Sequence, residues 1–326
     1  MLPPFSYVRP DKLKDAVKYL SEQRTAVHAG GTDLLGCLRD GIMSVDKVVS
    51  ISALKELHGI RETEDGGIII GAMTTITEVS EHPAIRTKYP GLAAGASEVA
   101  SPQLRNQGTL GGNLCQKPRC WYYRGEFDCL RKGGQKCFAI SGENQFHAIF
   151  GHEDICIITH PSDTAPVLAA LNAHVHATGS KGERTIPVSD LFVLPSENVM
   201  KETLLEPDEI ITHIQLPPPS SNLRSSYRKV RARRAWDFAL AGVALALEMD
   251  GGRVIKGRVV LSGAAPIPWR SRPVEDVIFG KQLDDKTIAD AAQAAVKGAE
   301  PVSENAYKLH LFRGVIEEEL AAIRDK

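Results

Sequence analysis

The chain has 326 residues, of which 43% are hydrophobic and 24% charged, and its formal net charge is −1 at pH 7. This is the composition of an ordinary soluble globular protein with a sizeable core, and the length predicts two or three domains. The charge balance excludes a bulk attraction to nucleic acid or membranes, and no apolar run approaches the roughly 20 residues of a membrane span. The N-terminus "MLPPFSYVRPDK" has no signal-peptide pattern, so we expect a cytoplasmic protein.

Residues 1–57 are predicted to form a small α/β unit. The apolar residues of "DKLKDAVKYLSEQ" fall on one helical face, and "TAVHA" and "KVVSIS" are predicted strands. Between the strands, the glycine turn "GGT" leads into a short predicted helix, "DLLGCLRDG".

Residues 58–222 are predicted to form a second α/β unit. We expect strands at "GGIIIGA" and "DEIITHIQLPPP", helices at "ITEVSEHPAI" and "PGLAAGASEVA", and a helix followed by a strand at "DTAPVLAALNAHVHATG". The segment "PPPSSN" is a linker candidate. In residues 223–326 we expect two long strands around the turn "DGG", and then three helices.

Two glycine-rich stretches predict a ligand cradle. In "AVHAGGTDLL", Gly30 and Gly31 allow positive φ and close backbone approach, so successive N–H groups can bind phosphate oxygens. An ordinary strand-turn-helix connection would look the same, and the stretch is neither a G-x-G-x-x-G motif nor a P-loop. The second stretch, "ASPQLRNQGTLGGNLC", is too polar for a buried strand and suits a second phosphate or sugar cradle. Two cradles indicate a long ligand with a diphosphate at its middle.

Four segments carry a family resemblance. In this order, "AGGTDLL", "QGTLGGNLC", "HPSDTAPVLAALNA" and "YRKVRARRAWDFALAGVALAL" resemble the FAD-binding (medium) subunit of the molybdenum hydroxylases, the family of xanthine dehydrogenase and carbon monoxide dehydrogenase relatives. The resemblance covers nearly the whole chain. It implies an α+β fold, with an FAD-binding domain of two α/β subdomains (PCMH type). A C-terminal domain with a three-stranded antiparallel sheet and a helical bundle would follow.

The resemblance also implies which residues bind FAD. Asp163 resembles an acceptor for a ribose or ribityl hydroxyl, and Lys229 resembles a lysine close to the isoalloxazine that would stabilise negative charge on a reduced flavin. Taken alone, Asp163 would be a helix N-cap and Lys229 a solvated strand lysine. The predicted FAD-binding residues are Ala26, Val27, His28, Ala29, Gly30, Gly31, Thr32, Asp33, Leu34, Ser101, Thr109, Gly112, Asn113, Asp163 and Lys229.

Five of the six cysteines lie between Cys115 and Cys156, in an insertion at about 115–160 that most family members lack. Four thiolates are what a 4Fe-4S cluster needs, and zinc could use the same four. The paired C-x₂₋₄-C spacing typical of zinc is absent, which favours the cluster. Cys115 directly follows the flavin loop, and Cys37 is expected to be a small buried hydrophobe. The predicted metal ligands are therefore Cys120, Cys129, Cys137 and Cys156.

Two relatives with such an insertion suggest the function. The segment resembles more closely that of the flavin subunit of bacterial three-subunit aldehyde oxidoreductase, and less closely that of the 4-hydroxybenzoyl-coenzyme A reductase β subunit. The resemblance implies an electron-transfer subunit with FAD and a 4Fe-4S cluster. Its partners would be a large subunit with the molybdenum cofactor, which oxidises an aldehyde or an aromatic or heteroaromatic compound, and a small 2Fe-2S subunit. A heterotrimer or a dimer of heterotrimers is expected, without nucleic acid or membrane.

Alternative functions remain open from the sequence. They are a stand-alone FAD oxidase of the vanillyl-alcohol type, a reductase of an aromatic coenzyme A thioester, and a zinc-stabilised binding module. A partner carrying a twin-arginine signal would place the complex in the periplasm.

Overall fold

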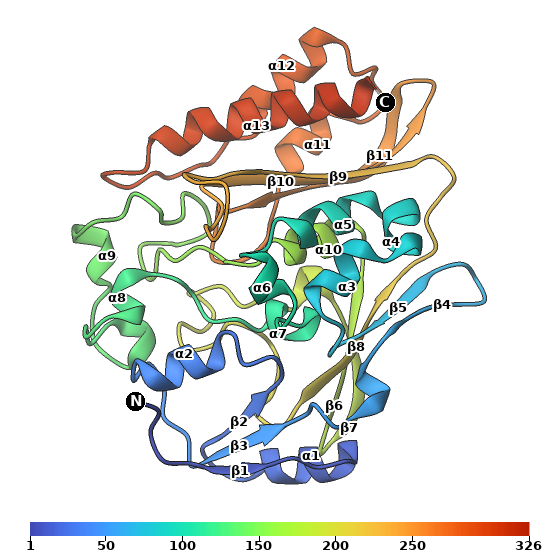
Figure 1. Cartoon of the computed structure of the whole chain (residues 1–326). Coiled ribbons are helices and arrows are strands. Elements are labelled where there is room, and N and C mark those ends of the chain that lie inside the picture. Colours follow the sequence, from blue (N-terminus) through green and yellow to red (C-terminus); the bar gives the residue numbers. More distant parts are fainter. Residues whose placement is uncertain (326) are drawn as a thin grey trace.

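The computed structural model describes residues 1–325, which form three sheets with helices between and around them (Figure 1). The predicted α+β class, with two α/β units followed by a C-terminal antiparallel sheet and helices, is confirmed. No helix in the described residues has the length and apolar character needed to cross a membrane.

The first sheet is small and parallel. Its strand order is β1 (Ser6–Val8), β3 (Lys47–Ser50), β2 (Thr25–His28). Helix α1 (Leu13–Leu20) packs its buried face on this sheet, and α2 (Leu34–Arg39) follows the glycine turn after β2. The turn therefore lies at the carboxyl end of a parallel strand, where α/β folds commonly bind ligands.

The second sheet is antiparallel and has five strands. Its order is β4 (Ile60–Glu62), β5 (Ile68–Gly71), β8 (Ile210–Leu216), β6 (His174–Gly179), β7 (Gly182–Pro187). Four helices pack into the core above it: α3 (Ile76–Glu81), α4 (Pro83–Lys88), α5 (Pro90–Ser97) and α10 (Thr164–Ala170). The single helix expected over "ITEVSEHPAI" is wrong, because Pro83 forces His82 out of the helical region and starts α4.

The third sheet separates two cores. Its order is β12 (Trp269–Arg270), β11 (Arg253–Ser262), β10 (Ala241–Asp250), β9 (Leu223–Val230), so the two-residue β12 adds a fourth strand to the three expected. Strand β10 is buried on both faces: Ala244 and Ala246 join the core of the second sheet, while Val243 and Leu245 face the C-terminal helices. Those helices are α11 (Arg272–Ile278), α12 (Asp285–Ala294) and α13 (Tyr307–Arg324).

Four short helices position the predicted site. They are α6 (Pro102–Arg105) and α7 (Leu110–Leu114) in the second glycine stretch, and α8 (Trp121–Arg124) and α9 (Phe138–Ser141) in the cysteine segment, defined here as residues 115–160. In Figure 1, α8 and α9 lie at one side of the molecule, between α2 and the third sheet.

Candidate functional site

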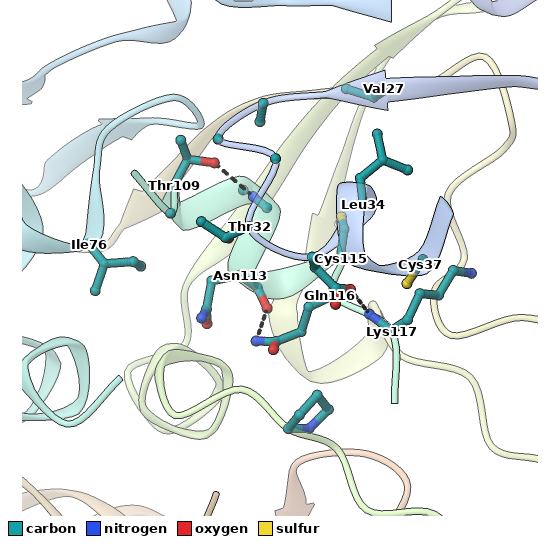
Figure 2. Close-up of a pocket in the computed structure, with 18 of the residues that line it drawn as sticks. Val27, Thr32, Leu34, Cys37, Ile76, Thr109, Asn113, Cys115, Gln116 and Lys117 are labelled. Atoms are coloured by element: carbon teal, nitrogen blue, oxygen red, sulfur yellow. Dashed lines mark hydrogen bonds between the residues drawn. The ribbon is translucent and has the colours of Figure 1, made fainter. Parts of the chain in front are cut away.

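A cavity of about 450 Å³ lies between the two glycine-rich loops, within the size range of small-molecule sites. Figure 2 shows side chains of both loops around it, Thr32 and Leu34 from the first and Thr109 and Asn113 from the second. Of the predicted flavin residues, all but His28, Ser101 and Lys229 line this cavity. His28 instead packs its ring edge-to-face with Tyr7.

The first loop meets the second at Gly30. A Cβ on Gly30 would lie 1.8 Å from the backbone carbonyl oxygen of Gln107, so no side chain fits there without moving one of the loops. Gly31 has a φ of +73°, a left-handed conformation that glycine adopts without strain. The loop thus brings its backbone amides to the cavity wall.

Backbone bonds hold the second loop to the second sheet. The N–H groups of Leu110 and Gly111 donate to the carbonyls of Thr74 and Ala72, each at 2.9 Å. The Thr109 hydroxyl accepts from the Gly112 N–H at 3.2 Å and caps α7. Ser101 has a similar role, because its hydroxyl caps α6 outside the cavity.

Asn113 connects the second loop to the "HPSD" segment. Its Oδ1 accepts from the hydroxyls of Ser162 at 2.5 Å and Thr164 at 2.7 Å. The two segments lie about 50 residues apart in the chain and form one wall of the cavity.

Asp33 does not cap α2, because its side chain makes no capping hydrogen bond. Its carboxylate faces the cysteine segment instead: Oδ1 lies 2.8 Å from Arg119 Nη1 and 2.9 Å from Arg124 Nη2, and Oδ2 accepts from the Lys117 N–H at 2.7 Å. Paired with two guanidiniums, this carboxylate no longer opposes an anionic ligand in the cavity.

Asp163 and Lys229 form a buried ion pair. Lys229 Nζ lies 2.7 Å from Asp163 Oδ2 and donates to the Glu98 carbonyl at 3.1 Å, and the Tyr227 hydroxyl donates to Asp163 Oδ1 at 2.8 Å. Asp163 is also no side-chain cap for α10. The solvated-lysine alternative is wrong, because the Lys229 side chain is 0% exposed.

Burial raises the pKa of Asp163, while the Lys229 ammonium works against that rise. Asp163 lines the large cavity, whereas Lys229 lies behind it and lines a separate open pocket along β9. Lys229 therefore contacts the carboxylate at the cavity wall rather than the cavity itself.

Sequence reasoning assigned no role to Trp236 and Phe238, although both line the cavity. Trp236 has a φ of +54°, and its N–H donates to the Ala100 carbonyl at 2.9 Å. The guanidinium of Arg119 lies 5.2 Å from the Phe238 ring centroid, within cation–π range. The only signal in the sequence is two large aromatic residues beside three arginines in "RARRAWDF".

The cysteines divide between two cavities. Cys120, Cys129, Cys137 and Cys156 line a second, small cavity, whereas Cys37 and Cys115 line the large one. The structure thus brings the four predicted ligands together from a 37-residue stretch and keeps Cys115 at the large cavity. As the side chains stand, no group of three or more His, Cys, Asp or Glu within residues 1–325 is arranged to hold a metal ion.

The small cavity is buried and has its own electrostatics. A hydrogen bond with the Cys156 thiol lowers the pKa of Cys137 to about 6, and raises that of Cys156. Burial raises the pKa of Cys120 to about 11, and His147 Nε2 lies 3.2 Å from Cys120 Sγ. Burial also lowers the pKa of His147 to about 4, so a neutral imidazole faces this thiol.

Aromatic packing holds the segment around this cavity. Tyr122, Phe127 and Phe138 form one cluster, with the Tyr122 and Phe127 rings 4.9 Å apart. Asn144 ties the segment to the C-terminal domain, because its Nδ2 donates to the Ser303 hydroxyl at 2.9 Å.

Comparisons with known proteins agree with this arrangement. Residues 3–219 match the family "FAD binding domain in molybdopterin dehydrogenase", and residues 225–321 match the "CO dehydrogenase flavoprotein C-terminal domain". The aldehyde oxidoreductase FAD-binding subunit PaoB of Escherichia coli is 34% identical, with 98% of each chain covered. The carbon monoxide dehydrogenase medium chain of Hydrogenophaga pseudoflava is 27% identical, over 93% of this chain and 90% of that one. A solved structure of carbon monoxide dehydrogenase from the same organism superimposes with a TM-score of 0.78 at 26% identity, covering 99% of each chain.

Proposed function

The chain belongs to the FAD-binding medium subunits of the molybdenum hydroxylases, which are oxidoreductases, and we propose that it carries a 4Fe-4S cluster in addition to FAD. In this proposal it passes electrons from partner subunits to an external acceptor. The observation that carries the proposal is the division of the cysteines: four around their own cavity, two at the flavin cavity.

The lining of the large cavity supports FAD as its ligand. Gly30 and Gly31 line it without side chains, and Lys117 and Arg119 bring positive charge to it, which suits a diphosphate. When bound, FAD accepts electrons singly and releases them singly or in pairs. The chain's contribution is to bind and orient this group.

Asp163 is the residue we assign to a flavin hydroxyl. Its carboxylate lines the cavity, while Tyr227 and Lys229 hold it from behind. Burial raises the pKa of Asp163, and the Lys229 ammonium opposes that rise, which favours the carboxylate form that accepts hydrogen bonds.

The ligand atoms at the small cavity suit a 4Fe-4S cluster, but the cavity must enlarge to hold one. Four cysteine sulfurs are the usual ligands of such a cluster. At about 10 Å³ the cavity is smaller than a four-iron cubane, so the thiols would have to turn outward to hold one. Three of the four cysteines, Cys120, Cys129 and Cys137, lie next to one-turn helices, where such movement disturbs little regular structure.

The partners we propose are a molybdenum-cofactor large subunit and a 2Fe-2S small subunit. The large subunit would oxidise an aldehyde, as the name of the PaoB relative indicates, or an aromatic or heteroaromatic compound. Other relatives are subunits of nicotinate and xanthine dehydrogenases, which supports the wider substrate range.

A crystal structure of the assembled complex, with anomalous diffraction at the iron and zinc edges, tests the proposal. We expect FAD in the large cavity and an iron peak among the four cysteines. Flavin with no metal at the cysteines would remove the cluster from the proposal, and a zinc peak would replace it with a structural zinc site. An empty large cavity would contradict the flavin assignment.

A further inference from the structure

A chain of ion pairs crosses the wall between the two cavities. Arg131 Nη1 lies 2.8 Å from Glu202 Oε1, and the other oxygen of Glu202 pairs with Lys117 Nζ. Arg131 lines the small cysteine cavity, whereas Glu202 and Lys117 line the large one. One carboxylate therefore contacts a cation from each site.

The Arg131 guanidinium is buried and only partly satisfied. Its side chain is 2% exposed, and beyond Glu202 it donates to the Lys201 carbonyl at 3.3 Å. Its Nε has no hydrogen-bond partner in the described residues, and the same is true of His147 Nδ1 at the same cavity. Two buried, unpartnered nitrogens at one cavity are a costly arrangement for the chain alone, and they suit an acceptor placed among the cysteines.

The wall also carries surplus positive charge. Arg131 and Lys117 share the carboxylate of Glu202, and Arg119 and Arg124 share that of Asp33. These four cations share two carboxylates, and of the four only Arg131 is fully buried, with a side chain that is 2% exposed. A buried guanidinium beside the cysteine cavity suits negative charge there, which four thiolates with their cluster would supply.

We propose that Arg131 is a positioning residue that raises the reduction potential of the four-cysteine cluster, and that Glu202 couples this charge to the flavin cavity through Lys117. The inference rests on the cluster assigned above. A buried cation beside a cluster favours the reduced, more negative form, because potentials follow local charge and hydrogen bonding. Removing the cation should lower the potential, whereas neutralising Glu202 should raise it.

The test is a redox titration of the assembled complex, with the reduced 4Fe-4S signal followed by electron paramagnetic resonance and the flavin by absorbance. In Arg131→Met we expect the equilibrium constant for cluster reduction to fall about tenfold, a shift of about 59 mV for one electron. Arg131→Lys should recover part of the shift. Glu202→Gln should move both the cluster and the flavin to higher potential.

Lys132→Met is the matched control, because Lys132 is the neighbouring cation but donates to the Gly125 carbonyl at 2.7 Å and does not line the cysteine cavity. We expect its potentials to match the wild type. Three results for the cluster's reduction potential would overturn the inference. They are equal shifts in Lys132→Met and Arg131→Met, no shift in Arg131→Met or Glu202→Gln, and shifts of the same sign in those two variants. If Arg131→Met does not assemble, the sign of the Glu202→Gln shift decides alone. A wild-type complex without the 4Fe-4S signal would instead refute the assigned cluster, and the inference with it.

Discussion

The first glycine loop and the cysteine segment line adjacent cavities but are built in different ways. The loop around Gly30 and Gly31 is set by backbone: a parallel strand ends, a glycine allows a close approach, and a helix begins. The cysteine segment has only one-turn helices, and side-chain contacts to distant residues hold it. A site made of backbone can be predicted from a short stretch of sequence, whereas a site made of distant side-chain contacts cannot.

The largest expected effect is a loss of iron from the cysteine cavity that leaves flavin bound in the large cavity. Cys129→Ser should remove about four irons per chain, because a cluster with three thiolates loses a strong bond, while FAD stays bound at the other site. Iron and flavin would be quantified in the purified complex. Cys115→Ser is the control, since Cys115 lines the flavin cavity. Wild-type iron in Cys129→Ser, or iron loss in Cys115→Ser, would show that the ligand set is misassigned.

The second prediction breaks the backbone-built site. In Gly30→Ala the new methyl group would overlap the Gln107 carbonyl, so the loops must separate. We expect FAD affinity to fall at least tenfold, or about 1.4 kcal/mol. Titration of the flavin-free variant with FAD measures this.

Gly36→Ala is its matched control. Gly36 lies inside α2 and a Cβ there would meet nothing within 4 Å, so alanine should stabilise the helix by about 0.5–1 kcal/mol. An unchanged flavin dissociation constant in Gly30→Ala would mean that the loops do not form the cradle.

Much of the fold could be predicted because its signals are local. The hairpin of β10 and β11 shows as two apolar runs around "DGG", and the first glycine turn shows as strand, glycine pair and helix. Only the family resemblance predicts strand β9; the apolar pattern does not, because the buried face of this strand is polar. Ser225 packs against α5, where its hydroxyl accepts from the Gly91 N–H at 3.1 Å.

The cysteine site could be predicted only as a set of thiols. The contacts that fold the segment join residues far apart in the chain, Arg124 to Asp33 and Arg131 to Glu202, separated by 91 and 71 positions. No spacing within the segment encodes these partners. The same reason applies to Asp33: its place before a short helix favours a cap, whereas its observed partners lie 84 and 91 positions away.

The third prediction tests the ion pairs of Asp33, which join the first glycine loop to the cysteine segment. Asp33→Ala leaves Arg119 and Arg124 without their carboxylate, and we expect the free energy of unfolding to fall by about 1–3 kcal/mol. The cysteine segment should become protease-sensitive before the rest of the chain. Limited proteolysis with mass spectrometry measures this, and Asp40→Ala, which removes an exposed carboxylate beside Arg39, is the control. Cleavage elsewhere first would contradict the anchoring role.

The smallest expected effect concerns Lys308, which ties α13 to the cysteine segment. Its side chain is fully buried, and its Nζ donates to the carbonyls of Gly263 at 2.9 Å and Phe146 at 3.2 Å. Burial lowers the pKa of Lys308 from 10.5 to about 7. Between those two values the unfolded chain binds more protons than the folded one, so stability should rise with pH across this window.

The free energy of unfolding should rise because of Lys308 by up to about 1.4 kcal/mol per pH unit in the middle of that window. The rise should level off above the pKa of Lys308 in the unfolded chain. Other groups titrate there too, so the quantity to compare is the slope of wild type minus that of Lys308→Met. Methionine fills a similar volume without a charge, so this variant should lose the slope and be as stable as wild type or more so near pH 7. Chemical denaturation of the complex across the window gives both slopes. Parallel slopes would mean that Lys308 stays charged in the folded chain, and that its hydrogen bonds to the two carbonyls are charge-assisted.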